Sequence, residues 1–263
     1  YQWVVNDFKY FAELHLYIRT SYDNEYLIFN KLLDQNQQYL LIVSAIELND
    51  KQEKEKITLV AKKFDQMHAT IRLLDLYDSN DFQDLVYKLL PKVRNKTLQE
   101  ITEAFDTVLI EFLEGEEIIT KGAYAAIGDL YKYELFQNTR NRWLNFTKYT
   151  LMRIDKYLAD VLDKPSYCKD TLADLEERFN KNNKKVYGMH LEHIYANNDK
   201  NKKLFTDEHG IFDEAKFNTV RNKLGMVLLL KDKQNISSNN DYYSLKVDDY
   251  KTSNLIWNEL LVG

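Results

Sequence analysis

The chain contains little of what builds sheets, disulfide frameworks or membrane spans. Among its 263 residues, 2 are Pro, 7 are Gly and only Cys168 is Cys. So few turn-forming residues argue against a sandwich or barrel and favour long helices. A single Cys excludes a disulfide framework and a Cys-based zinc site. The longest apolar run, residues 39–46, is interrupted by Ser44 and falls short of the ~18 residues that span a bilayer. We therefore expect a mainly helical, cytoplasmic protein.

Charge is distributed unevenly along the chain. The whole chain has a formal net charge of -5 at pH 7. Residues 180–251 contain 13 Lys and Arg against 10 Asp and Glu, so this segment is basic while the remainder is acidic. A basic C-terminal segment on an acidic body is one feature of proteins that bind a polyanion, and chance variation is the alternative.

Helical periodicity dominates the first two-thirds of the chain. Apolar residues recur every three or four positions in the stretches 57–74, 98–112 and 151–161. Thr97 and Glu100 have the spacing of a capping box before the second stretch, and Gly115 follows it as a stop. Shorter helices are predicted at 8–18, 25–33, 39–48, 81–90 and 172–180. No repeat is visible, so we expect residues 1–179 to form an irregular helical bundle.

The pattern changes near residue 180. Residues 186–195 and 223–231 are short apolar or partly alternating segments, which predicts two strands separated by a long loop. The polar segment 232–251 has room for a helix, and residues 255–261 predict another short helix. This order of elements indicates a second domain over residues 180–263.

A cluster of polar side chains lies on the first predicted strand. Side chains alternate along a strand, so His190 and Glu192 share one face and His193 lies on the other, unless the strand ends or twists there. A carboxylate can hold a hard divalent cation, and a neutral histidine can take a proton from water. Asn235 and Asn239 are one helical turn apart and are candidate further ligands. An ordinary hydrogen-bonded surface cluster is the alternative interpretation.

The motifs of this region resemble the C-terminal nuclease domain of GmrSD-type restriction enzymes, which are modification-dependent (type IV). That domain has the pattern IEHI-P, then GNL-LL, then an Asn and a downstream Lys. The corresponding stretches here are MHLEHIYAN from Met189, KLGMVLLL from Lys223 and DKQNISSNNDYYSLK from Asp232. Two departures occur: Tyr195 and Ala196 stand where the family has its Pro after EHI, and Met226 stands at the Asn of GNL. The resemblance implies a small ββα-metal, or His-Me finger, nuclease domain of the HNH-like class after the helical bundle.

The resemblance also implies the chemistry of the site. His193 would be the general base that activates water for attack on a phosphodiester. Glu192 and Asn235, with Asn239, would hold one Mg²⁺ or Mn²⁺, which stabilises charge on the phosphate and on the leaving 3′ oxygen.

Further residues would support this site. His190 would orient its neighbours or be merely structural, and Asn222 would compensate for the Asn that Met226 replaces. Lys231, Lys233 and Lys246 would contact DNA phosphates without reading sequence, with ordinary solvated lysines as the alternative.

The implied setting is defence against phage DNA, with DNA, including modified phage DNA, as the partner. No Walker-type glycine loop occurs in the chain, so the resemblance places a nucleotide-hydrolysing N-terminal domain outside it. No membrane partner is expected, and a homo-oligomer is compatible with the sequence. One alternative function is a catalytically degenerate DNA- or protein-binding module on a helical scaffold, motivated by Met226. Another is a purely helical regulatory protein.

Overall fold

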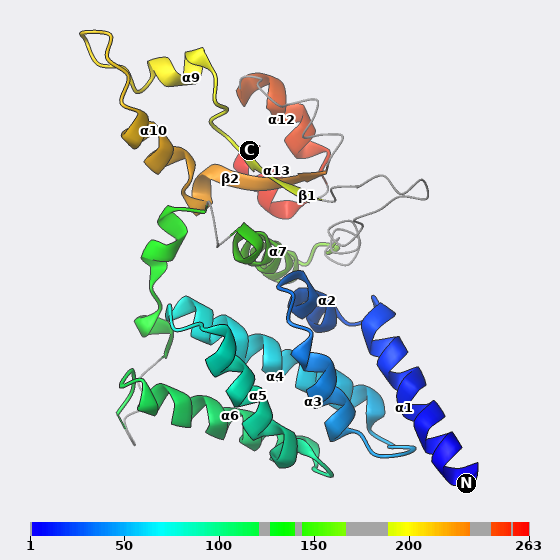
Figure 1. Ribbon diagram of the computed structural model, residues 1–263. Coiled ribbons are helices and arrows are strands. Elements are labelled where there is room, and N and C mark those ends of the chain that lie inside the picture. Colours follow the sequence, from blue (N-terminus) through cyan, green and yellow to red (C-terminus); the bar gives the residue numbers. More distant parts are fainter. Residues whose placement is uncertain are drawn as a thin grey trace. The chain divides into compact units, whose positions relative to one another are not determined.

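The computed structural model describes residues 2–120, 127–139, 144–166, 189–231, 243–253 and 255–262. Within these ranges the chain is mainly helical, as predicted, and contains a two-stranded sheet (Figure 1). The chain divides into two compact units, Tyr1–Lys132 and Tyr133–Gly263. No helix within the described ranges has both the length and the apolar composition needed to cross a bilayer.

The division between the units places helix α7 (Leu144–Val161) in the second unit. The boundary expected at residues 179 and 180 falls outside the described residues. Helix α7 contacts strand β2 (Val227–Lys231) and helix α13 (Ile256–Val262), which explains why it joins the C-terminal unit. Its amphipathic pattern predicted a helix, but such a pattern does not reveal which core the apolar face will join.

The first unit is an irregular helical bundle. Its described elements are α1 (Gln2–Thr20), α2 (Glu25–Leu32), α3 (Gln37–Ala45), α4 (Glu53–Leu73), α5 (Ser79–Val93), α6 (Leu98–Gly115) and the 3-10 turn η1 (Ile127–Leu130). Every helix predicted between residues 8 and 115 is therefore confirmed. The predicted capping box is present: the Thr97 side chain accepts from the Glu100 backbone, and the Glu100 side chain accepts from the Thr97 backbone.

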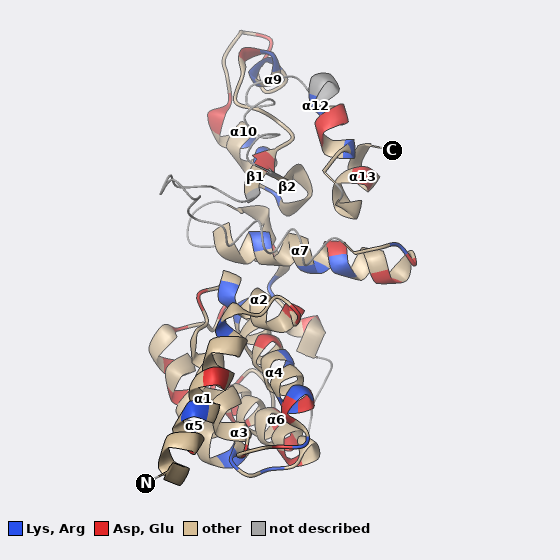
Figure 2. Cartoon of the chain, turned by 90° about the vertical axis from the view of Figure 1, so that its right-hand side faces the viewer, with Lys and Arg blue, Asp and Glu red and all other residues tan. Residues whose placement is uncertain are grey.

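Helix α4 is central to the core of this bundle and contacts α2, α3 and α6. Val60, Phe64 and Met67 are buried along it at helical spacing. Removing these apolar side chains from water is the main term that stabilises such a bundle. Lys and Arg are interspersed with Asp and Glu along α4 and also along α7 of the second unit, so neither helix is uniformly basic (Figure 2).

The second unit combines a small antiparallel sheet with several helices. Its described elements are the 3-10 turn η2 (Tyr133–Gln137), α7, β1 (Met189–His193), α9 (Asp199–Lys203), α10 (Glu214–Arg221), the 3-10 turn η4 (Leu224–Met226), β2, α12 (Tyr243–Lys251) and α13. Both predicted strands are confirmed within the described residues, and β2 begins at Val227, four residues after the start of the predicted segment. The helix predicted at 172–180 lies outside the described residues.

The register of the sheet determines which side chains face α12. Glu192 pairs with Leu228, and His190 pairs with Leu230. Leu228 and Leu230 are buried in one cluster with Tyr250 of α12. Since directly paired residues of neighbouring antiparallel strands point to the same face, His190 and Glu192 lie on the α12 side of the sheet. His193, the next residue, is directed to the other side.

Candidate functional site

His193, the last residue of β1, is held by a side-chain hydrogen bond. Its Nε2 lies 3.0 Å from Oδ1 of Asn222, the residue that ends α10. Because an amide oxygen only accepts, Nε2 carries the ring proton in this contact, and Nδ1 of the neutral imidazole carries the lone pair. His193 is thus half-buried, and this contact orients its ring.

Asn222 is itself fixed in place. The residue is 5% exposed. Its backbone oxygen accepts a hydrogen bond from the Thr139 N–H at 2.7 Å, and its N–H donates to Asn218 at 3.2 Å. The group that orients His193 is therefore anchored on two sides before any ligand binds.

Backbone contacts hold the chain on either side of this pair. The N–H of Ile194 donates to the backbone oxygen of Met226 at 3.0 Å. The Nε of Arg221 donates to the backbone oxygen of Tyr195 at 3.1 Å. Met226 stands at the position of the Asn of the family pattern. Its main-chain oxygen accepts the hydrogen bond that holds the segment after His193. This contact does not depend on the Met226 side chain.

Glu192 contacts a buried lysine on the other side of the sheet. Nζ of Lys246, on α12, forms an ion pair with Oε1 of Glu192 and donates to the backbone oxygen of His193 at 3.4 Å. The Lys246 side chain is 0% exposed, and Glu192 is 8% exposed. The sequence predicted that Lys246 contacts DNA phosphates, but its burial and its bond to Glu192 do not support that role.

Burial and neighbouring charges oppose each other at Glu192. Burial raises the pKa of the Glu192 carboxyl above its usual value. The hydrogen bond and charge of Lys246, the charge of Arg221 and the His193 N–H all act to lower that pKa. One carboxylate thus has two cationic neighbours, and Arg221 is a component that sequence reasoning missed. Nothing in the sequence distinguishes this arginine from an exposed residue at the end of a helix.

The structure brings together four of the predicted site residues, namely Glu192, His193, Asn222 and Lys246. His190 is half-buried and lies on the same face as Glu192. The other predicted residues cannot be placed: Asn235, Asn239 and Lys233 lie outside the described residues, as does the side chain of Lys231.

The described residues do not fit a divalent ion at Glu192. Among them, no group of three or more His, Cys, Asp and Glu side chains could hold a metal ion. Of the three predicted metal ligands, Glu192 is the one that lies among the described residues, and its carboxylate is already paired with Lys246.

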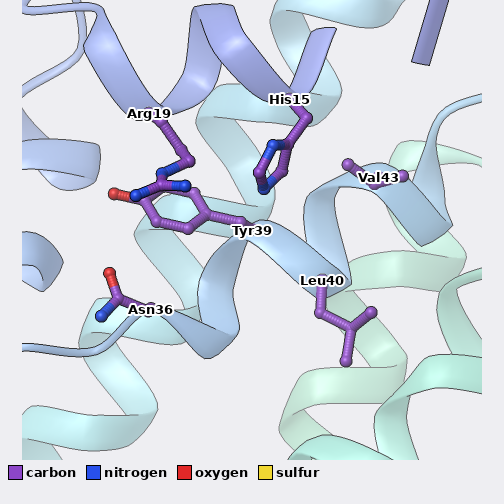
Figure 3. A pocket seen from close by; sticks show the side chains of 6 residues that line it. All are labelled: His15, Arg19, Asn36, Tyr39, Leu40 and Val43. Atoms are coloured by element: carbon purple, nitrogen blue, oxygen red, sulfur yellow. The ribbon is translucent and has the colours of Figure 1, made fainter. Parts of the chain in front are cut away.

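A separate pocket of about 530 Å³ lies in the first unit (Figure 3). It is lined by His15, Arg19, Asn36, Tyr39, Leu40 and Val43. The His15 ring stands edge-on to Tyr39, with ring centroids 6.2 Å apart. This lining offers cationic and apolar groups, but it lacks a carboxylate to act beside the histidine, so we do not place the chemistry here.

Comparison with protein families matches residues 135–262 to GmrSD restriction endonucleases, C-terminal domain. The match spans nearly all of the second unit, including β1, β2, α12 and every residue of the site around His193. The matched family is the one that the motifs predicted for this part of the chain. No curated protein and no solved structure gave a match to the chain.

Proposed function

We propose that the second unit is the nuclease module of a restriction endonuclease and hydrolyses phosphodiester bonds in DNA, with His193 as the general base. The observation that carries this proposal is the 3.0 Å contact between His193 and Asn222. It fixes a histidine at the end of a strand within a domain of the GmrSD family. Modified phage DNA is the substrate that best suits this family.

In the proposed reaction, Nδ1 of His193 takes a proton from a water molecule as the water oxygen attacks phosphorus. The bond from phosphorus to the leaving 3′ oxygen then breaks, and that oxygen acquires a proton from solvent. Imidazole is the most frequent general base in enzymes, and such a base contributes about 10²–10⁴-fold in rate. No step of this proposal passes through a divalent ion, because the described residues do not fit one at Glu192.

Asn222 has a positioning role in this proposal. By accepting the Nε2 proton of His193, it leaves Nδ1 as the basic atom and restrains rotation of the ring. A base that is aligned in advance does not have to be ordered at the moment of reaction. The anchoring of Asn222 by Thr139 and Asn218 supports this role.

Plasmid nicking by the whole chain tests the proposal. The native chain, His193→Ala and the control His209→Ala are compared on unmodified and phage-modified DNA, with Mg²⁺ or Mn²⁺ supplied. His209 is a suitable control because it is an exposed loop histidine of the same unit. We expect the native chain and His209→Ala to nick DNA, and His193→Ala to lose about a hundredfold or more in rate.

Nicking by a folded His193→Ala variant at the native rate would contradict the proposal. Salt-sensitive DNA binding by the native chain without nicking in any condition would favour the degenerate binding module instead. Circular dichroism of each variant shows whether it is folded.

A further inference from the structure

We infer that Lys246 occupies the cation position at Glu192, so that Glu192 binds the chain's own ammonium group rather than a divalent ion. The resemblance assigned the opposite role to Glu192, that of a metal ligand. The inference rests on the geometry of buried lysines alone in the first and third arguments below, and also on the proposed role of His193 in the second.

The first argument is the burial of the pair. The Lys246 ammonium has two oxygen partners on β1, namely the Glu192 carboxylate and the backbone oxygen of His193. Its side chain is fully buried. A divalent ion at Glu192 would have to displace this ammonium and leave it buried without its counter-charge. Breaking a buried ion pair in this way is strongly unfavourable, because it leaves an uncompensated charge in the interior.

The second argument is the direction of the two side chains. Glu192 lies on the face of the sheet that carries Leu228 and Leu230 and is covered by α12. His193 is directed away from that face and contacts Asn222. Metal-assisted hydrolysis requires the ion and the activated water to act on one phosphate. An ion at Glu192 would lie on the opposite side of the strand from the proposed base.

The third argument is a matching pair elsewhere in the chain. In the first unit, Nζ of Lys56 lies 2.7 Å from Oδ2 of Asp50 and donates to the backbone oxygen of Ala45 at 3.2 Å. Both charged side chains are buried there as well, at 6% and 8% exposure. A buried lysine that joins a carboxylate to a main-chain oxygen is thus a structural link that this protein uses twice among its described residues.

Calorimetric titration of the whole chain with Mn²⁺, without DNA, tests the inference. The native chain is compared with Glu192→Gln/Lys246→Met, which replaces both charges by neutral groups of similar size. The matched control is Asp50→Asn/Lys56→Met, which removes the corresponding pair of the first unit. We expect all three proteins to bind Mn²⁺ equally, within about twofold, or not at all.

The inference is overturned if Glu192→Gln/Lys246→Met binds Mn²⁺ about tenfold or more weakly than the native chain while the control keeps the native affinity. Loss of a group that merely supports a metal ligand already weakens metal binding by this much. Circular dichroism shows whether the variant is folded. The Mn²⁺ affinity of the single variant Glu192→Gln, compared with that of the native chain, gives a second test of the same point. Because no DNA is present, the result is separate from the outcome of the nicking assay.

Discussion

Asn222 and His193 are 29 positions apart in the sequence, and their side chains meet at 3.0 Å. This contact joins the end of α10 to the end of β1, and backbone contacts through Met226 and Tyr195 reinforce it. The family pattern provides an Asn four positions later, where this chain has Met226. Asn222 supplies a side-chain amide from the preceding helix, so the substitution does not remove the amide from the neighbourhood of the histidine.

Asn222→Ala is expected to lower the rate of DNA nicking by about 10–100-fold, because the His193 ring loses the acceptor that orients it. The DNA concentration that gives half-maximal rate should stay unchanged, since Asn222 is not proposed to bind substrate. Nitrogen NMR of the His193 ring provides a second measurement: Nε2 is protonated in the native chain, and the variant should show both tautomers.

Asn218→Ala is the control, because Asn218 lies one turn earlier on α10 and accepts the Asn222 N–H with its backbone oxygen, which the substitution keeps. This variant should nick DNA at the native rate. Equal rates for Asn222→Ala and Asn218→Ala would mean that the side-chain contact to His193 has no positioning role.

Helices α1 to α7 and both strands were predictable because each depends on local periodicity, whereas α9 and α10 lie in the segment that was predicted to be a long loop. In the stretch 57–74, apolar residues recur every three or four positions, and nearly all of this stretch lies in α4. Thr97 and Glu100 are a local signal of where α6 begins. The placement of α7 was not predictable, because its apolar face is compatible with more than one core. In the structure it contacts β2 and α13 and belongs to the second unit.

Within the candidate site, the motif singles out His193 as the proposed base, whereas no sequence feature indicated the environment of Lys246. Lys246 follows a long polar segment, where a lysine is usually solvated. Its partner Glu192 is 54 positions away. The sequence contains no local signal for a buried pair over this separation, so the lysine was assigned to the DNA surface. Asn222 was proposed from the sequence as a residue that compensates for the Asn replaced by Met226, and the structure adds its contact to His193.

Lys246→Met is expected to destabilise the second unit by about 3–5 kcal/mol, because it leaves the Glu192 carboxylate buried without its cation. Glu192→Gln/Lys246→Met should recover most of that loss, since both charges are then absent. Denaturant unfolding of the whole chain at neutral pH measures the two variants. Lys56→Met, which breaks the Asp50 pair, should destabilise the first unit instead. A double variant as unstable as Lys246→Met would show that the loss comes from packing and not from an unpaired charge.

Asp155→Asn is expected to stabilise the chain at pH 8 or leave its stability unchanged. Asp155 is 1% exposed and accepts a hydrogen bond from the Trp257 N–H at 2.8 Å at the start of α13. The amide of Asn keeps an acceptor for that N–H. Burial raises the pKa of the Asp155 carboxyl, although the backbone N–H groups of Trp257 and Ile256 oppose it.

The pH dependence of this effect follows from the sign of the shift. A carboxyl whose pKa is higher in the folded than in the unfolded state contributes less stability as pH rises through the folded value. The difference in unfolding free energy between Asp155→Asn and the native chain should therefore shrink as pH falls toward 3.8, the pKa of the Asp carboxyl in the unfolded chain, because the native carboxyl is then protonated as well. Denaturant unfolding at several pH values measures it. An Asp155→Asn variant that is equally destabilised at every pH would contradict this account. Asp155→Ala should lower the free energy of unfolding by about 1 kcal/mol, because the Trp257 N–H at the start of α13 then loses its acceptor.

His68 is expected to make the first unit less stable in acid. Its ring is fully buried, with the Tyr77 and Phe82 ring centroids 4.9 and 5.2 Å away, and Nε2 accepts a hydrogen bond from Arg72. Burial, aided by the charge of Arg72, lowers the pKa of His68 from 6.5 to about 3. Between these two values the unfolded chain binds a proton that the folded chain does not, so stability is lost as pH falls through this window.

The variant that tests this effect is His68→Phe, which keeps an aromatic ring in the cluster and cannot be protonated. Its unfolding free energy should fall less steeply than that of the native chain between about pH 6.5 and pH 4, because the linkage of His68 is gone. His15→Phe replaces an exposed histidine of the same unit and should keep the native slope. Equal slopes for His68→Phe and the native chain would show that the acid sensitivity comes from carboxylates, which lose their ion pairs on protonation, and not from the buried imidazole.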